Sequence, residues 1–120
     1  QACTTCGRLR FPPTVMCPHC QSTTRHWQPV SGQGTIWSFI VAHPPLLPAY
    51  APFAPFPVIT VTLAEEPYLR MVGNLVTGPQ GAINEIDPES IVIGEPVQVV
   101  FSPRIRSDGT TMFLPAWVRP

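Results

Sequence analysis

The chain has 120 residues, which is enough for one ordinary domain or for a small module joined to a slightly larger one. Its formal net charge is zero, only 12% of its residues are charged, and every basic residue is an arginine. No apolar run approaches the roughly 20 residues of a membrane-spanning helix, and no secretion signal is recognisable. We therefore expect a cytoplasmic protein with no membrane partner. Its neutrality also argues against a dedicated nucleic-acid binder, which is normally basic.

The shortage of charge predicts a partner protein. A folded chain of this size exposes roughly 6,400 Å² by the usual scaling. With 14 charged residues, the surface then carries one charge per about 450 Å². Free monomers usually carry more charge, because charge keeps them soluble. Hydrophobic residues make up 44% of the chain, so a core can form and the surface is the unusual part.

The strongest chemical motif is a pair of C-x-x-C sequences, Cys3-Thr4-Thr5-Cys6 and Cys17-Pro18-His19-Cys20, which uses every cysteine of the chain. Four thiolates on two tight turns suit a tetrahedral, structural Zn²⁺ site, because four protein ligands leave no position for water. Gly7 directly follows the first pair and supplies the positive φ that such a turn needs. The sequence therefore predicts a rubredoxin-like zinc ribbon over residues 1–29, with Cys3, Cys6, Cys17 and Cys20 as metal ligands.

Other uses of the four cysteines fit the sequence less well. Two disulfides are typical of a secreted domain, and a redox-active C-x-x-C normally begins a helix after a strand. Rubredoxin-type iron sites use similar paired turns, so the spacing alone leaves both zinc and iron open. A loaded Zn(Cys)₄ centre carries two negative charges, which backbone N–H groups and Arg8, Arg10 or Arg25 are expected to balance.

Residues 30–120 are expected to form a separate β module, because short β-like runs alternate with turn signals. Strands are predicted near residues 35–41, 58–63, 68–75, 97–101 and 111–114. Asp108-Gly109 is a strong hairpin signal between the last two strands, and Asp87-Pro88 is typical of a helix start. Five strands with a short helical element after the third is the order of an OB-fold barrel. The predicted fold class is therefore mainly β, a zinc ribbon followed by a five-stranded OB-fold.

A proline-rich segment at residues 43–57, called the arm below, fits neither a strand nor an ordinary loop. It holds six prolines and no charge, within a stretch from His26 to Ala64 that lacks Asp, Glu, Lys and Arg. Proline favours an extended path, along which large apolar side chains become anchors for a partner. These are Leu46, Leu47, Tyr50, Phe53 and Phe56. The alternative is that the arm folds back over one barrel mouth and completes the core.

Two further regions are candidates for contacts. The last six residues, 115–120, are stiffened by proline and carry Trp117, which we expect to reach a partner. Arg104 and Arg106 lie two apart at a strand end, so they share a face and are candidates for binding phosphates or partner carboxylates. No catalytic residue is predicted, because every cysteine belongs to the metal motif and no histidine has a nearby carboxylate.

Several of these segments resemble the domain-of-unknown-function-35 (DUF35) family. The ribbon shows its pattern of Cys3-x-x-Cys6-Gly7, Phe11-Pro12-Pro13 and Cys17-Pro18-x-Cys20. Weaker matches run through the barrel: Gly34-Thr35, Pro57-Val58, Ile93-Gly94-Glu95-Pro96-Val97 and Leu114-Pro115-Ala116-Trp117. The resemblance spans essentially the whole chain. Family members usually begin with a helix ahead of the ribbon, which this sequence does not show.

The resemblance implies a non-catalytic partner of thiolase-superfamily enzymes that act on acyl-CoA. Such domains stabilise the thiolase-like subunit or link it to a neighbouring enzyme in a hetero-oligomer. Some are fused behind a hydratase of the hot-dog fold in bacterial steroid side-chain degradation. There the thiolase-like partner is a retro-aldolase that releases propionyl-CoA.

The alternative function is a nucleic-acid-binding zinc-ribbon and OB-fold protein. Single-strand binders combine a basic groove with stacking aromatic side chains, and Trp37, Phe39 and Tyr68 are available for stacking. A neutral chain gains little from counterion release. We therefore expect no nucleic-acid partner.

Overall fold

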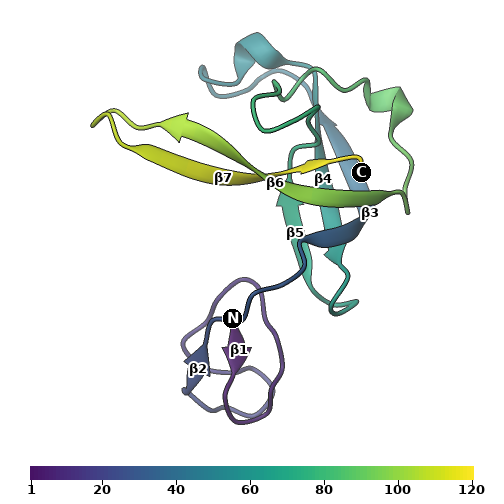
Figure 1. Ribbon diagram of the computed structural model, residues 1–120. Helices are drawn as coiled ribbons and strands as arrows, with labels where there is room; N and C mark the ends of the chain where they lie inside the picture. The colour runs from purple at the N-terminus through teal and green to yellow at the C-terminus, as the bar shows by residue number, and fades with distance from the viewer.

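A computed structural model describes residues 1–120 and shows a small ribbon joined by a short linker to a β-barrel (Figure 1). The strands are β1 (Ala2–Cys3), β2 (Arg25–His26), β3 (Gln33–Ala42), β4 (Phe56–Leu63), β5 (Arg70–Gly73), β6 (Pro96–Ile105) and β7 (Thr111–Val118). Two 3-10 turns, η1 (Ala51–Phe53) and η2 (Pro88–Ser90), complete the elements. The predicted fold class is confirmed. No helix in the chain has the length and apolar character needed to span a bilayer.

The barrel is an antiparallel sheet with the strand order β5-β4-β3-β6-β7. Strand β3 pairs with β4 along its length and with β6 near its start, and its register shifts between Ile36 and Ser38. Such a bulge bends a strand and increases its twist, which lets β3 serve both halves of the sheet. A bridge between Leu75 and Trp117 brings the two ends of the sheet together, so the barrel is nearly closed. All five predicted strands are present, although β5 is shorter than predicted.

The two predicted turns are confirmed in their chemistry. Asp87 caps η2 by accepting a hydrogen bond from the N–H of Glu89 at 3.0 Å, and Pro88 occupies the first position of the turn. Gly109 lies between β6 and β7 with φ at 82°, a conformation that favours glycine. These local signals determine where η2 begins and where the chain turns from β6 into β7.

Trp117 belongs to the core of the barrel. Its side chain is 1% exposed and packs in a cluster of buried apolar residues that also contains Ile36, Ile59, Val61, Leu63, Leu69, Leu75, Ile91 and Val97. A Cβ on Gly73 would lie 2.8 Å from the indole Nε1 of Trp117, so the close approach of β5 requires glycine. The prediction that Trp117 contacts a partner is therefore wrong, because this side chain closes the barrel.

The end of the chain is also held by the barrel. Arg119 donates to the carboxylate of Glu95 at 3.0 Å and to the carbonyl of Ser90 at 2.8 Å. The hydrogen bond from Arg119 lowers the pKa of Glu95. A lowered carboxyl pKa stabilises the fold at neutral pH, and that contribution is lost as pH falls through the pKa of the folded state. Residues 115–120 therefore do not form a free tail.

The chain is more extended than a compact domain. Its radius of gyration is 16.2 Å, against about 14 Å for a globular chain of this length. Figure 1 shows the cause: the ribbon lies below the barrel, and the far half of the β6–β7 hairpin projects beyond it. Much of the surface therefore belongs to features that lie outside the barrel.

Replacing Trp117 by alanine is expected to lower the free energy of unfolding of the barrel by about 3–5 kcal/mol, because a large core side chain is removed and a cavity remains. Urea denaturation followed by circular dichroism measures the change. Val72→Ala is the matched control, because Val72 is 66% exposed on the neighbouring strand β5. Equal effects of the two substitutions would contradict the assignment of Trp117 to the core.

Candidate metal centre and docking surface

The two C-x-x-C turns of the ribbon have the same backbone geometry. The carbonyl of Cys3 accepts from the N–H of Gly7 at 2.9 Å, and the carbonyl of Cys17 accepts from the N–H of Gln21 at 2.8 Å. Gly7 has φ at 74° and Gln21 has φ at 64°. The second turn therefore places a non-glycine residue in the left-handed region. Nothing in the sequence indicates this conformation of Gln21, because the second turn has no glycine at the position that corresponds to Gly7.

The turns bring the four sulfurs together. All four Sγ atoms lie within 4.8 Å of one another, with 3.5 Å between Cys3 and Cys20 and 3.7 Å between Cys6 and Cys17. Zinc–sulfur bonds of about 2.3 Å in a tetrahedron give sulfur–sulfur separations of about 3.8 Å. The observed spacing therefore fits a tetrahedral metal ion. Cys3 and Cys17 are buried, so the cluster is shielded from water on that side.

The electrostatics of the cluster also favour a cation. The backbone N–H of Cys6 is the main influence that lowers the pKa of Cys3, to about 6, and the N–H of Cys20 lowers that of Cys17 in the same way. The N–H of Ser22 lowers the pKa of Cys20, but burial and the three other sulfurs outweigh it and raise this pKa to about 11. Adjacent thiolates repel one another. A divalent cation among them removes that repulsion.

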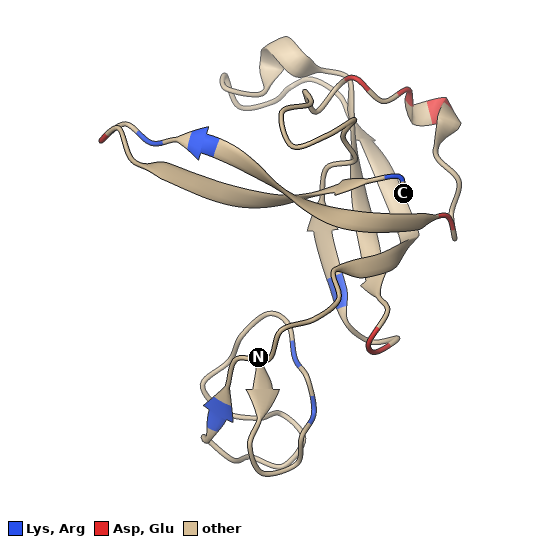
Figure 2. Cartoon of the chain, viewed as in Figure 1, with Lys and Arg blue, Asp and Glu red and all other residues tan.

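The arm divides into exposed and buried parts. Leu47 is 71% exposed, Tyr50 48% and Phe53 38%, and no charged residue lies on this segment (Figure 2). Leu46 is half-buried. Phe56 is buried as the first residue of β4, where its ring lies 6.1 Å from that of Tyr50. The prediction that Phe56 is an exposed partner anchor is therefore wrong, because its ring is buried beside Tyr50.

The arm is not uniformly extended, because η1 tightens its second half. Its aromatic side chains Tyr50 and Phe53 line a cavity of about 300 Å³ together with Ile83 and Arg104. The cavity joins the arm to the β6–β7 hairpin. Arg104 and Arg106 are both exposed near the end of that hairpin, and neither forms an ion pair. The Arg104 side chain has its only hydrogen bond with the adjacent carbonyl of Pro103.

The β6–β7 hairpin carries an apolar surface that sequence reasoning missed. Alternate residues of β6 share a face, so the face that places Val97 in the core continues outward to Phe101 and Ile105. Phe113 lies on the same face, because it pairs with Pro103 across the ladder. These side chains are strongly exposed: Phe101 59%, Ile105 81% and Phe113 62%. The feature of the sequence that indicates this surface is the length of the apolar runs on both sides of Asp108-Gly109.

A four-cysteine ribbon and an OB-fold barrel define the class of this chain as a zinc-ribbon and OB-fold protein. The family model described as the ChsH2 C-terminal OB-fold domain matches residues 27–102, and the ChsH2 rubredoxin-like zinc ribbon domain matches residues 1–24. The chain belongs to this ChsH2 family of DUF35 proteins. The exact division at residues 29 and 30 stays a prediction.

Known relatives agree with this assignment. The chain is 40% identical over 97 residues to a "Probable enoyl-CoA hydratase alpha subunit" of Thermomonospora curvata, covering 81% of this chain and 27% of the relative. It is 33% identical over 108 residues to a "DUF35 domain-containing scaffold protein" of Methanothermobacter thermautotrophicus, covering 89% and 72%. The chain thus spans about a quarter of the hydratase subunit but most of the scaffold protein.

Two further similarities are to a hydratase subunit and to an aldolase of known structure. The "3-oxo-4,17-pregnadiene-20-carboxyl-CoA hydratase alpha subunit" of Mycobacterium tuberculosis is 35% identical over 95 residues, which cover 79% of this chain and 27% of the relative. A solved structure titled "Ltp2-ChsH2(DUF35) aldolase" matches with a TM-score of 0.76 and 35% identity, covering 98% of this chain and 80% of that chain. The fold is therefore shared over nearly the entire length.

Cys17→Ser is expected to abolish metal binding and unfold the ribbon, because structural zinc supplies about 10 kcal/mol or more to such modules. Elemental analysis and amide NMR spectra of residues 1–29 measure both effects. Met16→Ser changes an exposed neighbour, 52% accessible, and should retain the metal. A ribbon that stays folded and metal-free in Cys17→Ser would contradict a structural metal. A red protein with visible absorption bands would show iron in place of zinc.

Proposed function

We propose that this chain is a non-catalytic scaffold domain that binds and stabilises a thiolase-superfamily subunit acting on acyl-CoA, as a required component of an acyl-CoA aldolase complex. The partner is the steroid side-chain retro-aldolase that releases propionyl-CoA, and the domain links it to a hot-dog-fold hydratase in the cytoplasm. The names of the relatives support this proposal, since they include scaffold proteins, hydratase alpha subunits and an aldolase complex.

The observation that carries the proposal is the apolar face of the projecting hairpin. Phe101, Ile105 and Phe113 continue the core face of β6 and β7 beyond the barrel, where this chain supplies nothing to pack against them. Exposed apolar surface of this kind marks protein interfaces. Residues 96–103 of β6 carry no charge (Figure 2), so docking this part of the hairpin desolvates no ionised group.

The arm adds a second apolar surface on the same module. Leu47, Tyr50 and Phe53 are exposed, and Tyr50 and Phe53 meet Arg104 of the hairpin around one cavity. Tyrosine, phenylalanine and arginine are all enriched at protein interfaces. Arg104 and Arg106 are proposed to pair with carboxylates of the partner or with CoA phosphates. Leu46, being half-buried, is proposed to support the arm as well as contact the partner.

The ribbon contributes structure. Cys3, Cys6, Cys17 and Cys20 are proposed to hold Zn²⁺, which when bound supplies a covalent-like crosslink between the two turns. The chain's own residues orient this crosslink: the turns fix the sulfurs, and backbone N–H groups favour their ionised forms. No ligand position is open for substrate in a four-thiolate centre.

Tyr50→Asp and Phe53→Asp are each expected to abolish co-purification with the thiolase-like subunit, because a carboxylate would be buried in an apolar contact. Ile105→Asp should act similarly through the hairpin. Co-expression followed by affinity purification measures the loss. Each variant should keep its metal and its circular dichroism spectrum.

Val72→Asp is the matched control, since Val72 is 66% exposed on the outer face of β5 and belongs to neither surface. It should co-purify as the unsubstituted chain does. If both arm variants still co-purify stoichiometrically, the arm is a self-packing loop. If the hairpin variant does so as well, the docking proposal fails.

A further inference from the structure

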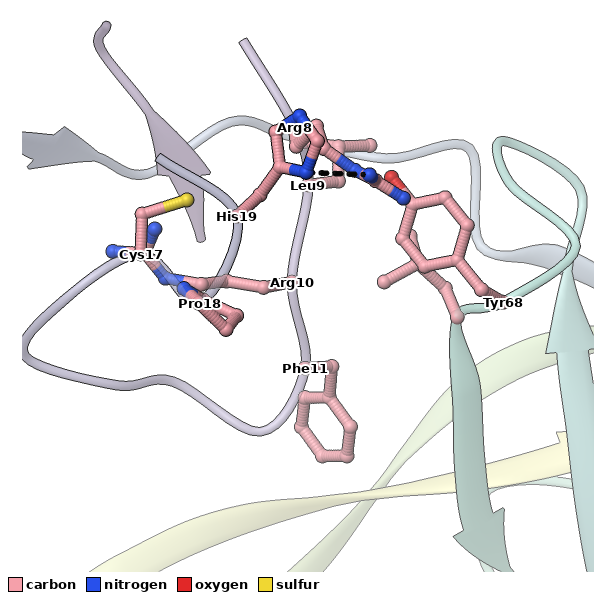
Figure 3. Close-up of a pocket in the computed structure, with 9 residues that line it drawn as sticks. Arg8, Leu9, Arg10, Phe11, Cys17, Pro18, His19 and Tyr68 are labelled. Carbon is pink, nitrogen blue, oxygen red and sulfur yellow. Dashed lines mark hydrogen bonds between the residues drawn. The ribbon is translucent and has the colours of Figure 1, made fainter. Parts of the chain in front are cut away.

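A pocket of about 350 Å³ lies between the ribbon and the barrel, away from the arm and the hairpin (Figure 3). Its ribbon side is built from residues 8–11 and from the second cysteine turn, and its barrel side comes from Tyr68 and Leu69. Two arginines, Arg8 and Arg10, line it, and no carboxylate does. The scaffold role described above uses none of these side chains for contact.

Arg8 is held in the pocket by neutral groups. Its guanidinium lies 4.9 Å from the centre of the Tyr68 ring, and its Nη1 donates to Nδ1 of His19 at 3.1 Å. Figure 3 shows the guanidinium between these two rings. An aromatic face and an imidazole orient the cation without cancelling its charge. With Nδ1 as the acceptor, Nε2 of His19 carries the hydrogen and is a further donor.

Arg10 leaves a buried donor without a partner. The residue is only 8% exposed, its Nε donates to Oε1 of Gln1 at 2.6 Å, and its Nη2 donates to the carbonyl of Thr14 at 3.4 Å. Its Nη1 is buried and has no hydrogen-bond partner. Both acceptors are uncharged. Figure 3 shows this side chain running toward Cys17, away from Tyr68, so the Arg10 guanidinium is directed into the ribbon and Arg8 is the cation that faces the pocket.

The charge balance of the ribbon leaves room for an anion. Arg8, Arg10 and Arg25 are its charged side chains, and the chain has no Asp or Glu before Glu65. A Zn²⁺ ion with four thiolates contributes two negative charges, so one positive charge of the three arginines stays unbalanced. The chain's one ion pair, between Arg119 and Glu95, lies elsewhere on the barrel.

We propose that this pocket binds a phosphate group. Donors approach it from both modules: the guanidinium of Arg8, the imidazole of His19 and the hydroxyl of Tyr68. A tetrahedral, doubly charged anion accepts from several directions at once, and arginine matches its geometry in a bidentate manner. The pocket is larger than a phosphate and has apolar walls from Leu9 and Phe11, so it takes a phosphate carried on a partly apolar organic group.

Titrations of the full, metal-loaded chain test this site without any enzyme partner. Phenyl phosphate, inorganic phosphate and phenylacetate are added separately in chloride buffer, and amide NMR shifts are followed. Phenyl phosphate is expected to bind saturably and most tightly, with the largest shifts at residues 8–11, 17–20 and 68–69. Inorganic phosphate should shift the same residues more weakly.

Arg8→Gln is expected to weaken phenyl phosphate binding about tenfold, as loss of a charged hydrogen bond does. Arg25→Gln is the matched control, because it removes the same charge from an exposed site on the same ribbon and does not line the pocket. Absence of saturable binding, or equal weakening by both substitutions, would overturn the proposal. Equally tight binding of phenylacetate would assign the site to carboxylates in place of phosphates.

Discussion

The packing of the Trp117 indole against Gly73 and Leu75 is the contact on which the rest of the barrel depends. It joins the first and last strands of the sheet, β5 and β7, and it is nearly inaccessible to water. Because the second half of β7 is fixed in the core, its first half and the paired end of β6 must leave the barrel as a hairpin. The side chain that completes the core therefore also directs the apolar hairpin outward.

The ribbon is stabilised in a different way. It has few buried apolar side chains of its own, and a module of this size needs a metal or disulfides to fold. The two equivalent turns bring four thiols so close that they cannot all ionise without a cation. The same centre then influences the neighbouring arginines, because its charge offsets part of theirs. The positive charge that the centre does not offset is proposed to act in the pocket beside Tyr68, between the two modules.

Local signals in the sequence predicted much of the fold. The cysteine spacing, the Asp87-Pro88 cap and Asp108-Gly109 each act over a few residues, and the structure has each of them. Burial was harder to predict, because it depends on contacts between distant segments. The apolar character of Phe56 and Trp117 predicts anchors for a partner, yet Trp117 packs in the barrel core and Phe56 is buried beside Tyr50. Phe101 and Phe113 are equally apolar but exposed, because β6 and β7 extend beyond the barrel.

The two apolar surfaces of the barrel module that carry little charge are the arm and the hairpin. We propose that a partner protein covers both. Hydrogen–deuterium exchange of the chain, alone and bound to a thiolase-superfamily subunit, tests this most directly. Stronger protection at residues 46–53 and 101–114 on binding, with little change on the outer face of β5, is the predicted result. Protection confined to other strands or to the ribbon, with both surfaces still exchanging freely in the complex, would contradict the docking assignment.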